Sequence, residues 1–220
     1  SSSMKPDVIV VCETWLTSST PDNFLLIPKY NTPVRCDRED GRKGGGVMIY
    51  VRQHYLCLPI TPLAISAHSE QVWLKISKNV ILVGIYVPPS LLTSTHNDIG
   101  DRMTETADKL LQEQTDLKFI IAGDVNQFPC SLLEQDLRVK NIVSLPTRGA
   151  STLDKILIDR DFCDHYCTPT IAPNLGNSDH HSVFLRPRRS RAFIPTMHEV
   201  YDYIQSKINK FLQFLHDYPW

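Results

Sequence analysis

The sequence lacks several features that would each point to a particular class of protein. It has no excess of basic side chains, because 23 lysines and arginines stand against 24 aspartates and glutamates in 220 residues, for a net charge of −1. No apolar run is long enough to cross a membrane, and no hydrophobic signal segment leads the chain. We therefore expect an intracellular protein with no membrane partner, in which any anionic partner is met by a local arrangement of charges.

Cysteine is too scattered to define a zinc site or a disulfide framework. The six cysteines lie at positions 12, 36, 57, 130, 163 and 167, which predicts reduced thiols. Cys163 and Cys167 flank His165, yet no second pair stands at zinc-finger spacing. A serine in a nucleophile-elbow motif is also missing, so covalent acyl chemistry is poorly supported.

What the sequence does contain is a series of short apolar segments with the length of strands. Residues 8–12 and 119–122 are apolar runs that predict strands covered on both faces, and Gly123 is expected to break the second. Val72, Leu74 and Ile76 alternate with polar neighbours, which predicts a half-buried strand. Further strands are predicted at residues 47–52, 80–86, 153–158 and 182–185.

Two segments have helical periodicity. Residues 98–114 predict an amphipathic helix that crosses back to the sheet. A capping box precedes a second amphipathic helix at residues 196–217, which we expect to pack on the domain itself or, alternatively, to belong to a following domain or partner. Many strands in mixed order with few helices predict an α/β layered sandwich of two mixed β-sheets flanked by helices. We place this domain at residues 5–186 and a basic linker at residues 187–195.

Polar motifs stand at the ends of the predicted strands. CETW follows the first strand, GDVN follows the strand at 119–122, a Leu-Asp pair opens the strand at 153, and SDHH precedes the last. Such ends converge on one rim, where open α/β sheets bind ligands. Oxygen-rich side chains suit Mg²⁺, which often shares its shell with a phosphate, so the set suggests phosphodiester hydrolysis. Its members are Glu13, Asp124, Asn126, Asp154, Asp179 and His180.

Each motif also has a plain structural interpretation when it is taken singly. An aspartate before a turn often caps a backbone group, and a lone histidine is usually structural or solvated. The occurrence of four such clusters in order favours the catalytic interpretation.

Six segments of the chain carry a resemblance to a known family. They are PDVIVVCETWL, RCDREDGRKGGGVMIYV, VGIYVPPS, FIIAGDVNQF, LPTRGASTLDKILI and LGNSDHHSVFL. Together they resemble the endonuclease/exonuclease/phosphatase superfamily and, within it, the apurinic-type endonuclease domain of non-LTR retrotransposons of the chicken-repeat or jockey kind. The resemblance implies a DNase I-like fold and a Mg²⁺-dependent endonuclease, with Mn²⁺ as a substitute metal. It also implies DNA as the substrate, a nuclear location and a reverse transcriptase domain of the same polyprotein as a partner.

The resemblance implies metal and water chemistry for five residues. Glu13 would bind Mg²⁺, with Asp179 near the metal. The hydroxyl of Tyr86 would help to hold the phosphate. Asp124 would orient or deprotonate the attacking water, assisted by Asn126.

The two adjacent histidines have different expected roles. Asp154 would accept one ring N–H of His180, which fixes the tautomer and favours the charged imidazolium. His180 would then face the scissile phosphate as a polarising donor or a general acid or base. His181 falls outside the motif, and strand alternation points it away from His180, so we expect it to be structural or solvent-facing.

One element of the family pattern has no match. Members begin with an earlier strand that carries an asparagine, whereas this chain starts at the following segment, so we expect an N-terminally truncated domain with an unpaired sheet edge. Losing one preorganised electrostatic contact costs on the order of 10²–10³ in rate. Three functions therefore stay open: a DNA endonuclease of full or weakened activity, an inactive retrotransposon-derived remnant or binding protein, and a phosphatase of small phosphorylated molecules.

Overall fold

The computed structural model describes residues 6–188. Its strands are β1 Val8–Cys12, β2 Val34–Cys36, β3 Val47–Val51, β4 Leu58–Ile60, β5 Glu70–Ser77, β6 Val80–Tyr86, β7 Lys118–Asp124, β8 Val139–Asn141, β9 Asp154–Asp159, β10 Thr170–Asn174 and β11 His181–Phe184. The helices are α1 Thr93–Glu113 and α2 Ser131–Asp136, with 3-10 turns η1 Asp22–Leu25 and η2 Arg160–His165. The amphipathic helix predicted at 196–217 and all but the first two residues of the predicted linker lie outside the described residues.

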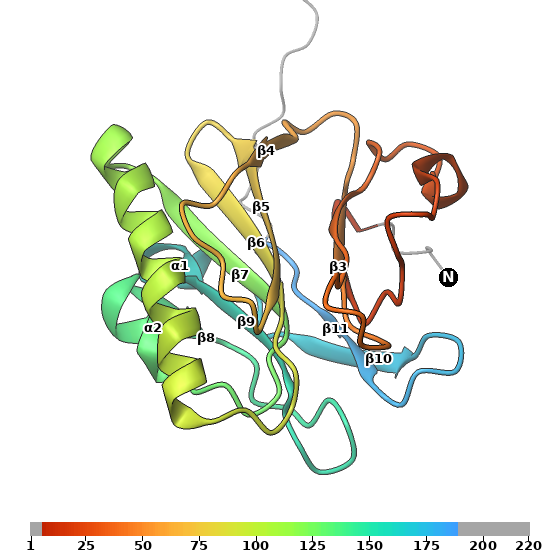
Figure 1. Cartoon of the computed structure of the whole chain (residues 1–220). Coiled ribbons are helices and arrows are strands. Elements are labelled where there is room, and N and C mark those ends of the chain that lie inside the picture. Colours follow the sequence, from red (N-terminus) through yellow and green to blue (C-terminus); the bar gives the residue numbers. More distant parts are fainter. Residues whose placement is uncertain (1–5, 189–220) are drawn as a thin grey trace, which may run out of the picture. The chain divides into compact units, whose positions relative to one another are not determined.

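The described residues form the predicted layered α/β sandwich (Figure 1). A mixed six-stranded sheet has the order β4-β5-β6-β7-β9-β8, with β6 and β7 parallel and the other neighbours antiparallel. An antiparallel three-stranded sheet has the order β1-β3-β2, and β10 pairs with β11 as a separate ribbon. Sequence analysis missed β2, β4, β8, β10 and α2, since segments of three to six residues show too little periodicity.

The six-stranded sheet is covered on both faces. On one face, Ile99 and Met103 of α1 pack in a cluster with Ile81 and Val83 of β6, and α2 adds Leu133. On the other face lies the three-stranded sheet, whose strand β3 is buried along its whole length. Figure 1 shows α1 and β3 on opposite sides of the six-stranded sheet. None of the helices in the described residues combines the length and the apolar character that a membrane span requires.

Two predictions of strand burial were wrong. The strand β5 was expected to be half-buried, yet Glu70–Leu74 are all buried, because Trp73 faces the helices while Val72 and Leu74 face the three-stranded sheet. The buried indole N–H of Trp73 donates to Gln71, which removes the cost of an unpaired donor. The strand β1 was expected to be covered on both faces, yet it is only half-buried, because it lies at the end of its sheet.

Gly123 does not break β7, contrary to expectation. The strand continues to Asp124, and Gly123 adopts a φ of 156° within it. A Cβ at this position would lie 1.8 Å from the carbonyl oxygen of Ile85 on β6, so only glycine permits the two strands to approach this closely. At this close approach Ile85 pairs with Gly123, and Tyr86 pairs with Asp124.

Candidate active site

Three of the predicted site residues lie in one row across three strands. The ends of the parallel strands β6 and β7 meet the start of the antiparallel strand β9 at one edge of the sheet. Tyr86 pairs in register with Asp124, and Asp124 pairs with Asp154. Neighbouring strands are about 4.8 Å apart, so residues distant in the sequence become direct neighbours.

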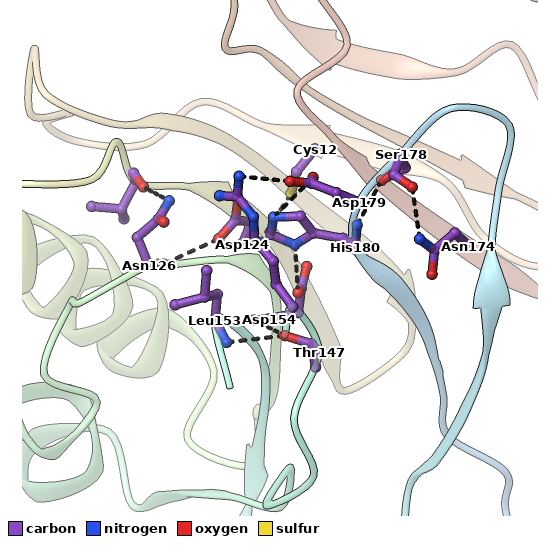
Figure 2. Close-up of polar contacts among 12 residues, drawn as sticks. Cys12, Asp124, Asn126, Thr147, Leu153, Asp154, Asn174, Ser178, Asp179 and His180 are labelled. Atoms are coloured by element: carbon purple, nitrogen blue, oxygen red, sulfur yellow. Dashed lines mark hydrogen bonds and ion pairs between the residues drawn. The ribbon is translucent and has the colours of Figure 1, made fainter. Parts of the chain in front are cut away.

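His180 joins this row from the segment that precedes β11. Its Nδ1 lies 2.8 Å from Oδ2 of Asp154 (Figure 2), and its backbone N–H donates to the hydroxyl of Ser178 at 3.1 Å. The imidazole is 18% exposed, so Nε2 can still meet a substrate. Three atoms that could bind a metal, one each from Asp124, Asp154 and His180, all lie within 4.8 Å of one another. His181, by contrast, is exposed, and its backbone N–H donates to the carbonyl of Thr147.

Asp124 is the most perturbed carboxyl of the cluster. Its side chain is buried, with 5% exposure, and burial, followed by the neighbouring carboxylate of Asp154, raises its pKa to about 6. The backbone N–H of Asn126 donates to Oδ1 of Asp124 at 3.2 Å, which opposes this rise. The side-chain amide of Asn126 donates to the carbonyl of Val87 at 2.8 Å, which fixes its orientation.

Cys12 contacts the backbone of Asp124 and was not expected to belong to the site (Figure 2). Its Sγ accepts the backbone N–H of Asp124 at 3.2 Å and donates to the carbonyl of Ile85 at 3.4 Å. Burial raises the pKa of this thiol well above its ordinary value, so the sulfur stays protonated. Its contribution is to join the end of β1 to the ends of β6 and β7.

Glu13 follows β1 and is held by protein donors. One carboxylate oxygen, Oε2, accepts the backbone N–H of Gly45 at 2.6 Å and the indole N–H of Trp15 at 2.8 Å. Burial, followed by the neighbouring carboxylate of Glu13, raises the pKa of Tyr86, so the phenol stays protonated. Glu13 thus lies beside the row at Tyr86, although it is not one of the three closely grouped ligands.

A buried ion pair behind Tyr86 was missed by sequence analysis. Arg38 donates to both carboxylate oxygens of Glu70, at 2.7 and 3.2 Å, and the two side chains are only 8% and 10% exposed. The guanidinium lies 5.5 Å from the centre of the Tyr86 ring. It therefore holds the ring between the two sheets by a cation–π contact. No local motif marks this pair, because its members are 32 residues apart.

Asp179 lies at the mouth of the site and is paired with a residue that sequence analysis did not single out. Its Oδ2 is 2.6 Å from a guanidinium nitrogen of Arg148, and the two side chains are 64% and 51% exposed. Its other oxygen is 4.0 Å from Nε2 of His180. The structure thus places Asp179 beside His180 and pairs the carboxylate of Asp179 with the guanidinium of Arg148. Arg148 belongs to the PTRG segment, which is part of the family resemblance. That membership was the one feature of the sequence that could have pointed to Arg148.

Thr147 is a second contributor from the PTRG segment. Its side chain is fully buried, and its hydroxyl accepts the backbone N–H groups of Leu153 and Asp154 at 3.0 and 3.1 Å. Its carbonyl accepts the N–H of His181. Thr147 therefore positions both partners of the Asp154–His180 contact (Figure 2).

Left-handed backbone conformations gather around the site. Glu13, Trp15 and Asn126 have φ values of 54°, 56° and 47°. Residues other than glycine rarely adopt this backbone conformation, because it costs on the order of 1–3 kcal/mol. It persists only where the surrounding structure imposes it. Glu13 directly follows β1 and Asn126 lies two residues beyond the end of β7, so these backbone conformations help to direct side chains at the strand ends.

The donor set fits a hard divalent cation. Asp124 and Asp154 hold two carboxylates at adjacent sheet positions, and their mutual repulsion contributes to the raised pKa of Asp124. A divalent cation bound close to such carboxylates relieves this repulsion. Mg²⁺ prefers oxygen ligands and keeps several waters, which suits a group that is open on the side of Asp179.

The chain is thus a layered α/β sandwich that carries a cluster of acids and an imidazole at its strand ends. The sequence pattern of the Endonuclease/Exonuclease/phosphatase family matches residues 2–180, and the chain belongs to this family. The resemblance described above is thereby confirmed at the level of the superfamily. No curated protein matches the sequence.

Solved structures share this fold at low sequence identity. An AP endonuclease, LMAP, from Leishmania major is 13% identical over 84% of this chain and 79% of that chain, with a TM-score of 0.61. An AP endonuclease from Archaeoglobus fulgidus is 13% identical over 83% and 89%, with a TM-score of 0.58. The endonuclease domain of TRAS1, a telomere-specific non-LTR retrotransposon, is 14% identical over 83% and 85%, with a TM-score of 0.57.

Proposed function

We propose that this chain is a Mg²⁺-dependent endonuclease that hydrolyses phosphodiester bonds in DNA. The observation that carries the proposal is the 2.8 Å contact between Asp154 and His180 beside the buried carboxylate of Asp124. Family membership supports phosphoester hydrolysis. The fold shared with AP endonucleases and a retrotransposon endonuclease domain is in keeping with DNA as the substrate.

In the proposed reaction, Asp124 activates the attacking water. A general base is most effective when its pKa lies near the working pH, and a pKa of about 6 meets this condition. The backbone N–H of Asn126 donates to Oδ1 of Asp124. Oδ2 is the oxygen left to accept the proton of the water. Burial keeps the carboxylate poorly hydrated, which strengthens its interaction with the water.

His180 is the proposed partner of the phosphate. With Nδ1 engaged by Asp154, its Nε2 is the nitrogen that meets substrate. As an imidazolium it would donate a proton or a hydrogen bond to the phosphate as negative charge develops in the transition state. The protonated hydroxyl of Tyr86 supplies a second donor from the same row.

Glu13 and Asp179 are the proposed metal ligands, with Mn²⁺ as a substitute for Mg²⁺. When bound, the ion neutralises charge on the phosphate oxygens. Asp179 is paired with Arg148 through Oδ2 at 2.6 Å, so Oδ1 is the oxygen left to bind the metal. The guanidinium of Arg148 also lies at the mouth of the site, where it could meet a phosphate oxygen. The proposal extends to a nuclear location and to a reverse transcriptase domain in the same polyprotein, the setting in which such a nick would be used.

Nicking of supercoiled plasmid in Mg²⁺ or Mn²⁺ tests the proposal. His180→Ala and Asp124→Ala should each lower the rate of nicking by about 10²–10⁴, the usual contribution of a general acid or base. His181→Ala is the matched control, because its side chain is exposed and lies outside the cluster, and it should nick at nearly the wild-type rate. Equal nicking by all three variants would contradict the assignment. Phosphate release from inositol phosphates in excess of plasmid cleavage would make the chain a small-molecule phosphatase instead.

A further inference from the structure

Trp15 is a large aromatic side chain left open beside the proposed site. It stands two residues after Glu13, and 68% of it is exposed. The indole of Trp73, in contrast, is almost completely buried in the core. Aromatic side chains contribute most to stability when they are buried, so the exposure of Trp15 does not serve the folding of the described domain.

The exposed indole is nevertheless held in one orientation. The backbone N–H of Trp15 donates to the carbonyl of Gly45 at 3.0 Å, and its indole N–H donates to Glu13 at 2.8 Å. Its backbone has the left-handed φ of 56°. A side chain that is ordered before binding loses little conformational entropy when a ligand arrives. Trp15 is therefore preorganised for contact with another molecule.

The contact that Trp15 can offer is apolar and planar. The indole has a single polar atom, Nε1, which Glu13 already occupies. Part of the ring edge rests near Gly44, where a Cβ would lie 3.6 Å from Cε2 and Nε1. What remains accessible is ring surface without a free hydrogen-bond donor. Such a surface can stack on any nucleobase but cannot distinguish one base from another by hydrogen bonding.

We propose that Trp15 is a stacking platform for an unpaired or displaced nucleobase of the DNA strand whose phosphate enters the site. This inference rests on the proposed function and deepens it, because it names a base contact that accompanies phosphate recognition. Glu13 links the platform to the site, because it accepts the indole N–H of Trp15 and its carboxylate lies beside the phenol of Tyr86. The platform strengthens binding without selecting a sequence.

A competing explanation is that Trp15 only orients Glu13 through its indole N–H. Two substitutions separate the two roles. Trp15→Phe keeps an aromatic face and loses the N–H, whereas Trp15→Ala loses both. The affinity for short single-stranded oligonucleotides, measured by fluorescence anisotropy in EDTA, reports on stacking without any contribution from metal or cleavage. A strand of the same length made of base-free tetrahydrofuran nucleotides retains the phosphates and offers no base.

Trp15→Ala should weaken binding of the mixed-sequence strand by about 5- to 150-fold, the range measured for base–aromatic stacking. Trp15→Phe should stay within about 3-fold of the wild type on that strand, because a phenyl ring also stacks. On the base-free strand the three proteins should bind equally. Circular dichroism of each variant establishes that it is folded.

Two results would overturn the inference. One is unchanged affinity of Trp15→Ala for the mixed-sequence strand, and the other is an equal loss on the base-free strand. If Trp15→Ala does not fold, the tryptophan fluorescence of the wild type is measured instead. Equal quenching of this fluorescence by the mixed-sequence strand and the base-free strand would then overturn the inference. Plasmid nicking by the wild type is scored separately. A wild type that nicks plasmid while Trp15→Ala binds normally sinks the platform alone, whereas a wild type that never nicks plasmid sinks the proposed function.

Discussion

Replacing Asp124 by asparagine should stabilise the metal-free protein while abolishing its proposed activity. The ordinary pKa of an aspartate carboxyl, 3.8, rises to about 6 at Asp124. At about 1.4 kcal/mol for each tenfold change in proton affinity, the ionised carboxylate destabilises the folded state by about 3 kcal/mol. The asparagine carbonyl can still accept the N–H of Asn126 at 3.2 Å, and its amide can donate to Asp154.

The sign of the effect depends on pH. Because the folded pKa lies above the unfolded one, the folded state gains from protonation below about pH 4, and this gain is lost as the pH rises through about 6. Asp124→Asn should therefore raise the free energy of unfolding by about 3 kcal/mol near pH 8, or Tm by about 6–12 °C. Near pH 4.5 this difference should fall to about a third.

Urea unfolding and thermal melts followed by circular dichroism in EDTA provide the measurement. Asp161→Asn is the matched control, because the exposed carboxylate of Asp161 is paired with Lys118 and its pKa is lowered. Asp161→Asn should not raise the free energy of unfolding at any pH. Addition of Mg²⁺ should stabilise the wild type and reduce its deficit relative to Asp124→Asn. A variant that is no more stable than the wild type near pH 8, or that keeps its full advantage near pH 4.5, would refute burial and charge repulsion as the cause of the raised pKa.

Three further substitutions test the structure around the site by urea unfolding. Arg38→Met should cost about 3–5 kcal/mol, because it leaves a buried carboxylate unpaired, whereas Arg42→Met in an exposed pair should cost less than about 1 kcal/mol. Gly123→Ala should cost at least about 3 kcal/mol, whereas Gly149→Ala, left-handed but unobstructed, should cost about 1 kcal/mol; equal costs would contradict the close strand approach. Thr147→Val should cost about 1–3 kcal/mol by removing the acceptor of two N–H groups, and it should slow nicking, so unchanged values would contradict its positioning role.

Much of the fold followed from short-range patterns in the sequence. The predicted strands at 8–12, 47–52 and 80–86 match β1, β3 and β6 within one residue, because apolar runs of this length between turn residues are a local signal. The burial of β5 did not follow, since its polar neighbours Glu70 and Gln71 are buried by partners elsewhere in the chain. Glu70 pairs with an arginine from a preceding loop, which periodicity does not reveal.

The candidate site shows the same division. The motifs CETW, GDVN and SDHH marked Glu13, Asp124 and His180 because each stands beside an apolar run. The contributions of Thr147 and Arg148 were not assigned, because a buried hydroxyl that accepts two backbone N–H groups and an ion pair across a loop have no fixed spacing.

The sequence by itself determined most of the longer strands, that the ends of several of them carry acids, an amide and an imidazole, and that the chain has the pattern of a phosphoester hydrolase family. These properties are local, since they depend on side-chain periodicity and on motif order. Only the tertiary structure decided which of the polar groups meet. The strand register aligns Tyr86, Asp124 and Asp154, and burial sets the pKa of Asp124. Both are properties of strand pairing and packing between residues distant in the chain, which one-dimensional patterns do not contain.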